Sequence, residues 1–193
     1  MKIVWTVLAT LAVLVAAGLL WLYSGAYDVA ASEPHTGAVR WALGTLQTRS
    51  IRRRAADVPP PPPLDDPALV LQGAGEYDEM CALCHGAPGV ERSAIGQGIT
   101  PEPPDLTREA PDWSDAELRW IVEHGIKLAG MPAFGETHDD RTLWSIVAFV
   151  RRLPRMSPAE YQRMATAAAA AEHDEHGEHG EHAEHGEHAG HTH

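Results

Sequence analysis

The chain has 193 residues, a net charge of −12 at neutral pH and two cysteines, which leaves room for one ordinary domain with appendages. The acidic balance argues against a nucleic-acid-binding surface. Seven acidic residues and no lysine or arginine occupy residues 164–193, so much of the charge lies at the end of the chain.

An apolar segment without charges runs from Ile3 to Tyr23. As a helix it would span about 30 Å, the thickness of a bilayer core. The alternative is a cleaved signal peptide, whose apolar region is about 7–15 residues long, with small residues 24–26 as the cleavage site. The length favours residues 1–24 as a single uncleaved transmembrane helix.

Residues 25–65 contain a basic segment and a proline run. The basic segment, residues 36–54, predicts an amphipathic helix with arginines towards its end. Such a helix either lies on anionic lipid or a membrane partner or packs on its own domain, and both interpretations stay open. The expected apolar face consists of Val39, Leu43, Leu46 and Ser50.

The proline run, Pro59–Pro63, predicts a polyproline II spacer of about 15 Å. A stiff spacer at this place would lift the following domain off a membrane.

The sequence Cys81-Ala82-Leu83-Cys84-His85 is typical of covalent haem attachment. Each thiol can form a thioether with a haem vinyl group, and the adjacent histidine is then an axial iron ligand. A redox CxxC motif would need alternating strands and helices, a structural zinc site needs four ligands, and a disulfide here would close a very small loop. These three alternatives are weaker.

Residues 66–155 read as three or four helices joined by glycine- and proline-rich loops. Asp66-Pro67 is a helix start, and that helix should run into Cys81. Gly73 lacks a side chain and would allow another helix to approach closely. The other expected helix signals are a capping box at Ser114 and Glu117, a cap at Thr137 and Asp140, and an end at Pro154.

Residues 66–155 resemble a class I monohaem cytochrome c. The resemblance rests on Gly73-x-x-x-Tyr77-x-x-x-Cys81-x-x-Cys84-His85, Pro104-Asp105-Leu106, Gly130-Met131-Pro132, and a last helix with Trp144 and Phe149. It implies an all-α fold around one covalent haem c, with the first and last helices crossing at the glycine and aromatic positions.

The resemblance also implies roles for single residues. The Pro104 carbonyl would accept a hydrogen bond from His85. Trp113 would donate its indole hydrogen to a haem propionate, or else serve as a core aromatic. Met131 lies between a glycine and a proline in a loop and would be the sixth iron ligand.

A His/Met-ligated haem implies an electron-transfer protein rather than an enzyme. The expected partners are membrane lipid and redox proteins, such as a terminal oxidase or a dehydrogenase complex. Haem attachment to this motif takes place outside the cytoplasm, which places the domain on the periplasmic side of the inner membrane. A positive-inside count of the arginines after the span argues the opposite, although most lie beyond the window of about 15–20 residues in which that rule acts.

Two other functions stay open: a haem peroxidase or ligand sensor, and a metal-handling protein. The second depends on residues 156–193, which predict a helix from Ser157 to about Ala171 followed by a disordered tail. Imidazoles in the tail suit Cu²⁺, Zn²⁺ or Ni²⁺, or else the tail is a solvated segment that gains charge below about pH 6.5. The candidate ligands are His173, His176, His179, His182, His185, His188, His191 and His193.

Overall fold

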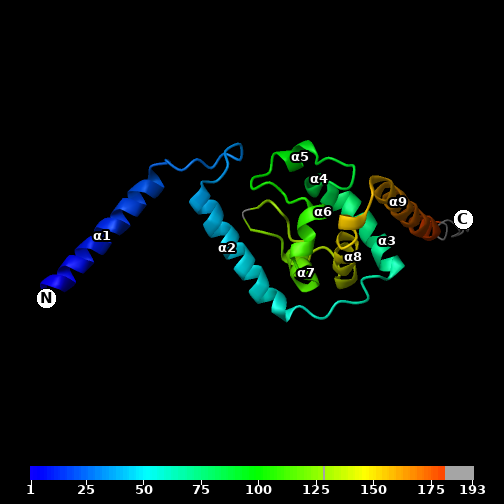
Figure 1. The fold of residues 1–193 in the computed structure, drawn as a ribbon, viewed down its shortest axis with the longest axis horizontal. Coiled ribbons are helices and arrows are strands. Elements are labelled where there is room, and N and C mark those ends of the chain that lie inside the picture. The colour runs from blue at the N-terminus through cyan, green and yellow to red at the C-terminus, as the bar shows by residue number, and fades with distance from the viewer. Residues whose placement is uncertain (128, 181–193) are drawn as a thin grey trace, which may run out of the picture. The chain divides into compact units, whose positions relative to one another are not determined.

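The computed structural model describes residues 1–127 and 129–180, with side chains up to residue 171. The chain divides into two compact units, residues 1–34 and a second unit that begins at His35. Among the described residues there is no named strand, only isolated bridges between Ala87 and Val90 and between Ile126 and Met131. The expected all-α fold is confirmed (Figure 1).

The helices follow one another in this order: α1 (Lys2–Tyr23), α2 (Gly37–Arg54), η1 (Ala55–Asp57), α3 (Pro67–Glu76), η2 (Tyr77–Cys81), α4 (Ala82–His85), α5 (Ala94–Gln97), α6 (Leu106–Glu109), η3 (Ala110–Asp112), α7 (Asp115–His124), α8 (Asp140–Val150), η4 (Leu153–Arg155) and α9 (Pro158–Gly180).

Helix α1 is long enough and apolar enough to cross a membrane, and none of its residues is buried. After Lys2 every position of the helix is apolar or small, the pattern of a helix surrounded by an apolar medium rather than of one with a single packing face. This helix fits a single-pass membrane anchor.

The C-terminal end of α2 packs on α7. Ile51 is almost fully buried, at 1% exposure, and the Arg52 Nε lies 3.5 Å from a carboxylate oxygen of Glu117. The expected apolar face was wrong at one position, because Leu46 is 66% exposed. Five residues separate it from Ile51, and at about 100° per residue that spacing turns its side chain away from the domain.

The proline run lies inside the second compact unit rather than before it. Ile51 and Ala55 before it are buried, and Val58 packs against the same hydrophobic core as Leu69 after it. Pro59–Pro63 therefore connects two parts of one compact unit, and the idea of a spacer that lifts the domain is corrected. The extended backbone of the run spans the surface between η1 and α3 (Figure 1).

Helices α3 and α8 cross at the centre of the core. A Cβ atom on Gly73 would lie 1.9 Å from the Ser145 carbonyl oxygen, so only glycine permits this approach. Tyr77 and Phe149 pack beside the crossing with ring centroids 5.3 Å apart. The crossing of the first and last helices of the domain thus occurs at the glycine and aromatic positions.

Side-chain caps define the starts of the surrounding helices. Asp66 accepts from the Ala68 amide at 3.0 Å, and Ser114 forms the expected capping box with Glu117. The expected cap at Thr137 was wrong: Asp139 caps α8 by accepting from the Thr142 amide at 2.8 Å. Thr137 instead lies in the preceding turn, where its amide donates to the Phe134 carbonyl.

Helix α9 belongs to the core at its first turns. Tyr161 is fully buried, and its hydroxyl donates to a carboxylate oxygen of Asp78 at 2.5 Å. The helix continues to Gly180, beyond the end expected near Ala171. The core therefore extends past residue 155.

Candidate functional site

The two cysteines lie on one continuous helical path that runs from α3 through α4. The turn from Tyr77 to Cys81 is a π-helix, a widened turn that is frequent at functional sites. The Tyr77 hydroxyl spans this turn and donates to the Gly86 carbonyl at 2.7 Å. This hydrogen bond links Tyr77, at the start of the π-helical turn, to Gly86, the residue directly after the CxxCH motif.

Both cysteines are free thiols. Burial raises the pKa of Cys81 to about 12, with the carboxylate of Glu76 adding to the effect. Below that pH the thiol is neutral, as an apolar site requires. The two sulfurs belong to residues three apart on this helical path and form no disulfide.

Helix α5 packs directly on the CxxCH segment. A Cβ atom on Gly96 would lie 2.6 Å from the Leu83 carbonyl oxygen and 2.9 Å from Cys84 Cα, so the glycine is needed for the contact. The Ser93 amide donates to the same Leu83 carbonyl at 3.0 Å. The backbone of the motif is held on this side by α5.

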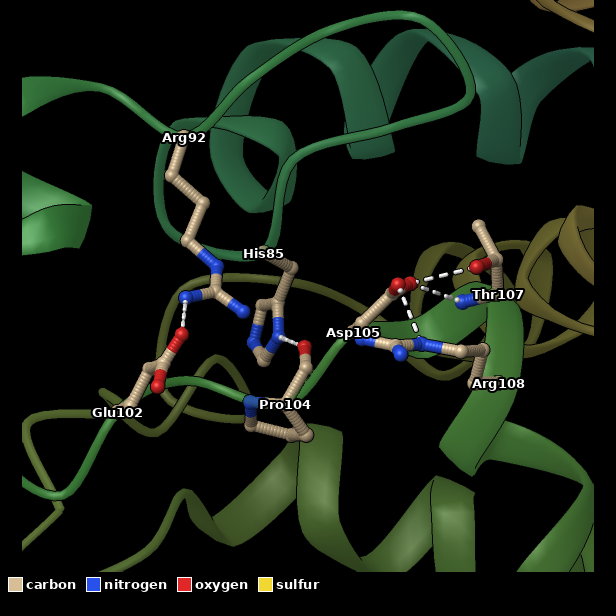
Figure 2. A network of polar contacts seen from close by, with 7 residues as sticks. All are labelled: His85, Arg92, Glu102, Pro104, Asp105, Thr107 and Arg108. Atoms are coloured by element: carbon tan, nitrogen blue, oxygen red, sulfur yellow. Dashed lines mark hydrogen bonds and ion pairs between the residues drawn. The ribbon is translucent and has the colours of Figure 1, made fainter.

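His85 is oriented by a backbone carbonyl. Its Nδ1 lies 2.9 Å from the Pro104 carbonyl oxygen, and because a carbonyl only accepts, Nδ1 carries the proton (Figure 2). Burial lowers the pKa of His85, which favours the neutral imidazole. The Nε2 lone pair is then available to a metal ion, and the hydrogen bond fixes the tautomer.

A polar network flanks His85, and the sequence patterns did not indicate it. Arg92 lies beside the imidazole and pairs with Glu102 (Figure 2). Asp105 caps α6 by accepting from Thr107 through both the amide, at 2.9 Å, and the hydroxyl, at 2.6 Å. These hydrogen bonds lower the pKa of Asp105 and hold the chain in place directly after Pro104.

Met131 lies on a loop that is fixed to the end of α7. The Ile126 amide donates to the Met131 carbonyl at 3.2 Å. Gly125 has a positive φ of 63°, and the chain turns there at the end of α7. The next residues continue the attachment, with Phe134 donating to the Val122 carbonyl at 3.2 Å. The methionine side chain is half-buried.

The segment before Pro104 contacts the Met131 loop. A Cβ atom on Gly130 would lie 3.2 Å from a methyl carbon of Ile99. The segment from Ile99 to Pro104 therefore reaches both the residue beside Met131 and the imidazole of His85. The structure thus brings the segments that carry His85, Pro104 and Met131 into one region.

Trp113 is half-buried and packs against the hydrophobic core. Its backbone carbonyl accepts from the Arg151 Nη2 at 2.6 Å, and Arg151 also pairs with Asp115 at 2.5 Å. These contacts fix the start of α7. The ring has the surroundings of a core aromatic, which was one of its two expected roles.

The histidines expected to bind metal in the tail are mostly outside the described residues, from His182 onward. The backbone of the first three belongs to α9. Among the residues described with side chains, no group of three His, Cys, Asp or Glu forms a metal site.

The donor set at His85 fits a covalent haem. Two thiols three residues apart, followed by an imidazole whose Nδ1 is already hydrogen-bonded, match the thioether and axial bonds that the group requires. Residues 68–150 match the family model for cytochrome c oxidase, cbb3-type, subunit III. The match covers most of α3 through α8 and excludes α1, α2 and α9. A search of the curated proteins finds no match.

Proposed function

From the premise that residues 68–150 form a class I c-type cytochrome domain, we propose that this chain is a membrane-anchored electron carrier. The domain supports a haem-based electron-transfer role. We extend this to a single His/Met-ligated haem c that passes electrons between redox proteins of the inner membrane or periplasm, with a terminal oxidase as the favoured acceptor.

The single observation that carries the proposal is the contact between His85 Nδ1 and the Pro104 carbonyl at 2.9 Å. Cys81 and Cys84 would hold the haem through thioether bonds, and His85 would bind its iron through Nε2. The bound group supplies one-electron iron chemistry. The hydrogen bond fixes the tautomer and the rotation of the imidazole and so preorganises the axial ligand.

Met131 is the proposed sixth ligand. The other methionines of the domain have different surroundings: Met80 adjoins Cys81, while Met156 and Met164 pack against the core. His124 stacks on Trp120 with ring centroids 4.6 Å apart, which gives it a surface role. A thioether ligand raises the reduction potential relative to a second histidine, which suits a donor to a high-potential acceptor.

Ligation of the iron by Met131 would distinguish an electron carrier from a haem peroxidase or a ligand sensor. A carrier keeps both axial positions filled and does no substrate chemistry, whereas a peroxidase or sensor needs an open or displaceable position. Mixing the reduced protein with carbon monoxide and the oxidised protein with cyanide discriminates between them. Slow, weak binding supports the carrier, and fast, tight binding contradicts it.

Helix α1 and the domain together suggest the location. The proposed arrangement places α1 across the inner membrane and the haem domain on the periplasmic side, where haem is attached to CxxCH. The tail histidines remain candidates for Cu²⁺, Zn²⁺ or Ni²⁺, as a second property of the same chain.

The proposal is tested on purified membranes with a pyridine haemochrome spectrum followed by a redox titration. A haemochrome band of the c type and one high-potential one-electron transition support it. A spectrum of the b type, or no redox-active haem in the membrane fraction, contradicts it.

A further inference from the structure

Helix α2 has an outward face that nothing in the described structure covers. Arg49 and Arg53 each lie two residues from the buried Ile51, so at about 100° per residue both lie on the opposite side of the helix. Leu46 is on the same side. Trp41 lies about 140° from Leu46 around the helix, on the flank of this face, and is 73% exposed. Ala42, Leu46, Arg49 and Arg53 follow the spacing of four, three and four that defines one helical face.

The charge of this helix has one sign. Residues 37–54 contain five arginines and no acidic residue, in a chain whose net charge is −12. Arg52 is engaged by Glu117 and Arg54 by the Ser50 hydroxyl at 2.7 Å. Among the described residues, no ion pair involves Arg49 or Arg53, so the helix packs with one side and leaves these two arginines outward.

The helix dipole accounts for only part of this pattern. Arginines in the last turn stabilise a helix C-terminus, and Arg52, Arg53 and Arg54 satisfy that need. Arg40 and Arg49 lie outside the last turn. The exposed Trp41 and Leu46 also have no use in a helix that is only solvated.

We infer that α2 lies on anionic lipid through the face formed by Ala42, Leu46, Arg49 and Arg53, called here the lipid face. A leucine side chain enters the interface between headgroups and acyl chains, while arginines bind anionic headgroups. Only residues 24–36 separate the candidate membrane span α1 from α2, so an anchored chain keeps this face close to a bilayer at high local concentration.

The consequence concerns the haem domain. Because Ile51, Ala55 and Val58 fix α2 and η1 to the domain, contact of the lipid face with the bilayer restricts the orientation of the whole domain. The carrier then presents a defined side to membrane redox partners rather than tumbling on a tether. Orientation by lipid is a property beyond the proposed electron transfer, and it depends only on α1 spanning the membrane.

The test places a nitroxide at Leu46→Cys in the full-length protein reconstituted in nanodiscs. Wild type without an introduced cysteine is the labelling control, since it takes no label when Cys81 and Cys84 are joined to haem. Collision with oxygen, which concentrates in lipid, and with a water-soluble nickel chelate reports the depth of the label. Ile95→Cys on α5 is the matched control, because Ile95 is 65% exposed and Leu46 is 66% exposed.

The expected result is a label at position 46 that oxygen reaches better than nickel in discs containing phosphatidylglycerol, and less so in pure phosphatidylcholine. The label at position 95 should stay water-accessible in both. Arg49→Gln/Arg53→Gln should lower the docked-to-free ratio about 25-fold, since each surface arginine contributes about fivefold. Arg141→Gln/Arg155→Gln removes the same charge elsewhere and should have little effect.

A label at position 46 that stays equally water-accessible in both kinds of disc overturns the inference. Protection that appears only when a purified oxidase is added also overturns it, and assigns the face to a protein partner. Neither result bears on electron transfer, because the depth measurement does not use the redox state of the haem.

Discussion

Gly73 of α3 lies directly against Ser145 of α8, where a Cβ atom would be 1.9 Å from the Ser145 carbonyl oxygen. The contact is between two helix backbones, so no flexible side chain can move to relieve a clash. This crossing holds the CxxCH-bearing helix on the core formed by α8, and thereby positions the candidate haem site.

We therefore predict that Gly73→Ala destabilises the haem-loaded protein by about 3 kcal/mol or more, at or above the usual cost of overpacking. Urea unfolding followed by haem absorbance or circular dichroism measures the change. Gly44→Ala is the control, because nothing lies within 4 Å of its added Cβ and alanine favours an exposed helix by up to about 1 kcal/mol. Equal stability of both variants would contradict the packing argument.

Met131→Ala should remove the sulfur-to-iron charge-transfer band that a methionine ligand gives the oxidised protein. The variant should also bind carbon monoxide quickly when reduced, because one axial position is then open. Met164→Leu keeps an apolar group of similar volume against the core and should retain the band. If wild type lacks the band, or Met131→Ala keeps it, the sixth ligand is another residue.

Asp105→Ala should destabilise the protein by about 1 kcal/mol at neutral pH, the usual cost of a lost helix cap. Hydrogen bonds from Thr107 lower the folded-state pKa of Asp105. A depressed folded pKa gives stability that is present above the unfolded value, about 3.9, and is lost as pH falls through the folded value. Unfolding curves of wild type and variant should thus converge in acid, whereas a constant gap across pH would contradict the cap.

Removal of residues 172–193 should lower the affinity for Zn²⁺ and Cu²⁺ without altering the haem spectrum. The histidines recur every three residues beside carboxylates, a ligand density suited to labile binding. Calorimetric titration of the full-length and shortened proteins at the same pH measures the difference. Equal affinities would exclude the tail as the binding element.

Local signals in the sequence predicted much of the fold and the candidate site. The caps at Asp66 and Ser114 act within three residues, and the spacing from Gly73 to His85 lies along one helical path, so pattern alone is informative. The Pro104 contact with His85 followed from the resemblance, because 19 residues separate the two and no local rule joins them.

Long-range packing accounts for what the sequence did not predict. Ile51 and Tyr161 lie outside residues 66–155 yet are buried, because the core needs apolar side chains from α2 and α9. Arg119 is buried as well, pairing with Asp140 at 2.6 Å and lying over the Trp144 ring. Its partner across 21 residues leaves no periodic signal, since burial of a charge depends on which helices meet.

The most direct test of the account is the mass of the peptide that contains Cys81 and His85, taken from protein extracted with acidic acetone and then digested. We predict that the colour remains with the polypeptide and that this peptide carries the added mass of one haem. Colourless protein, with a peptide of unmodified mass, would contradict covalent attachment and with it the proposed function.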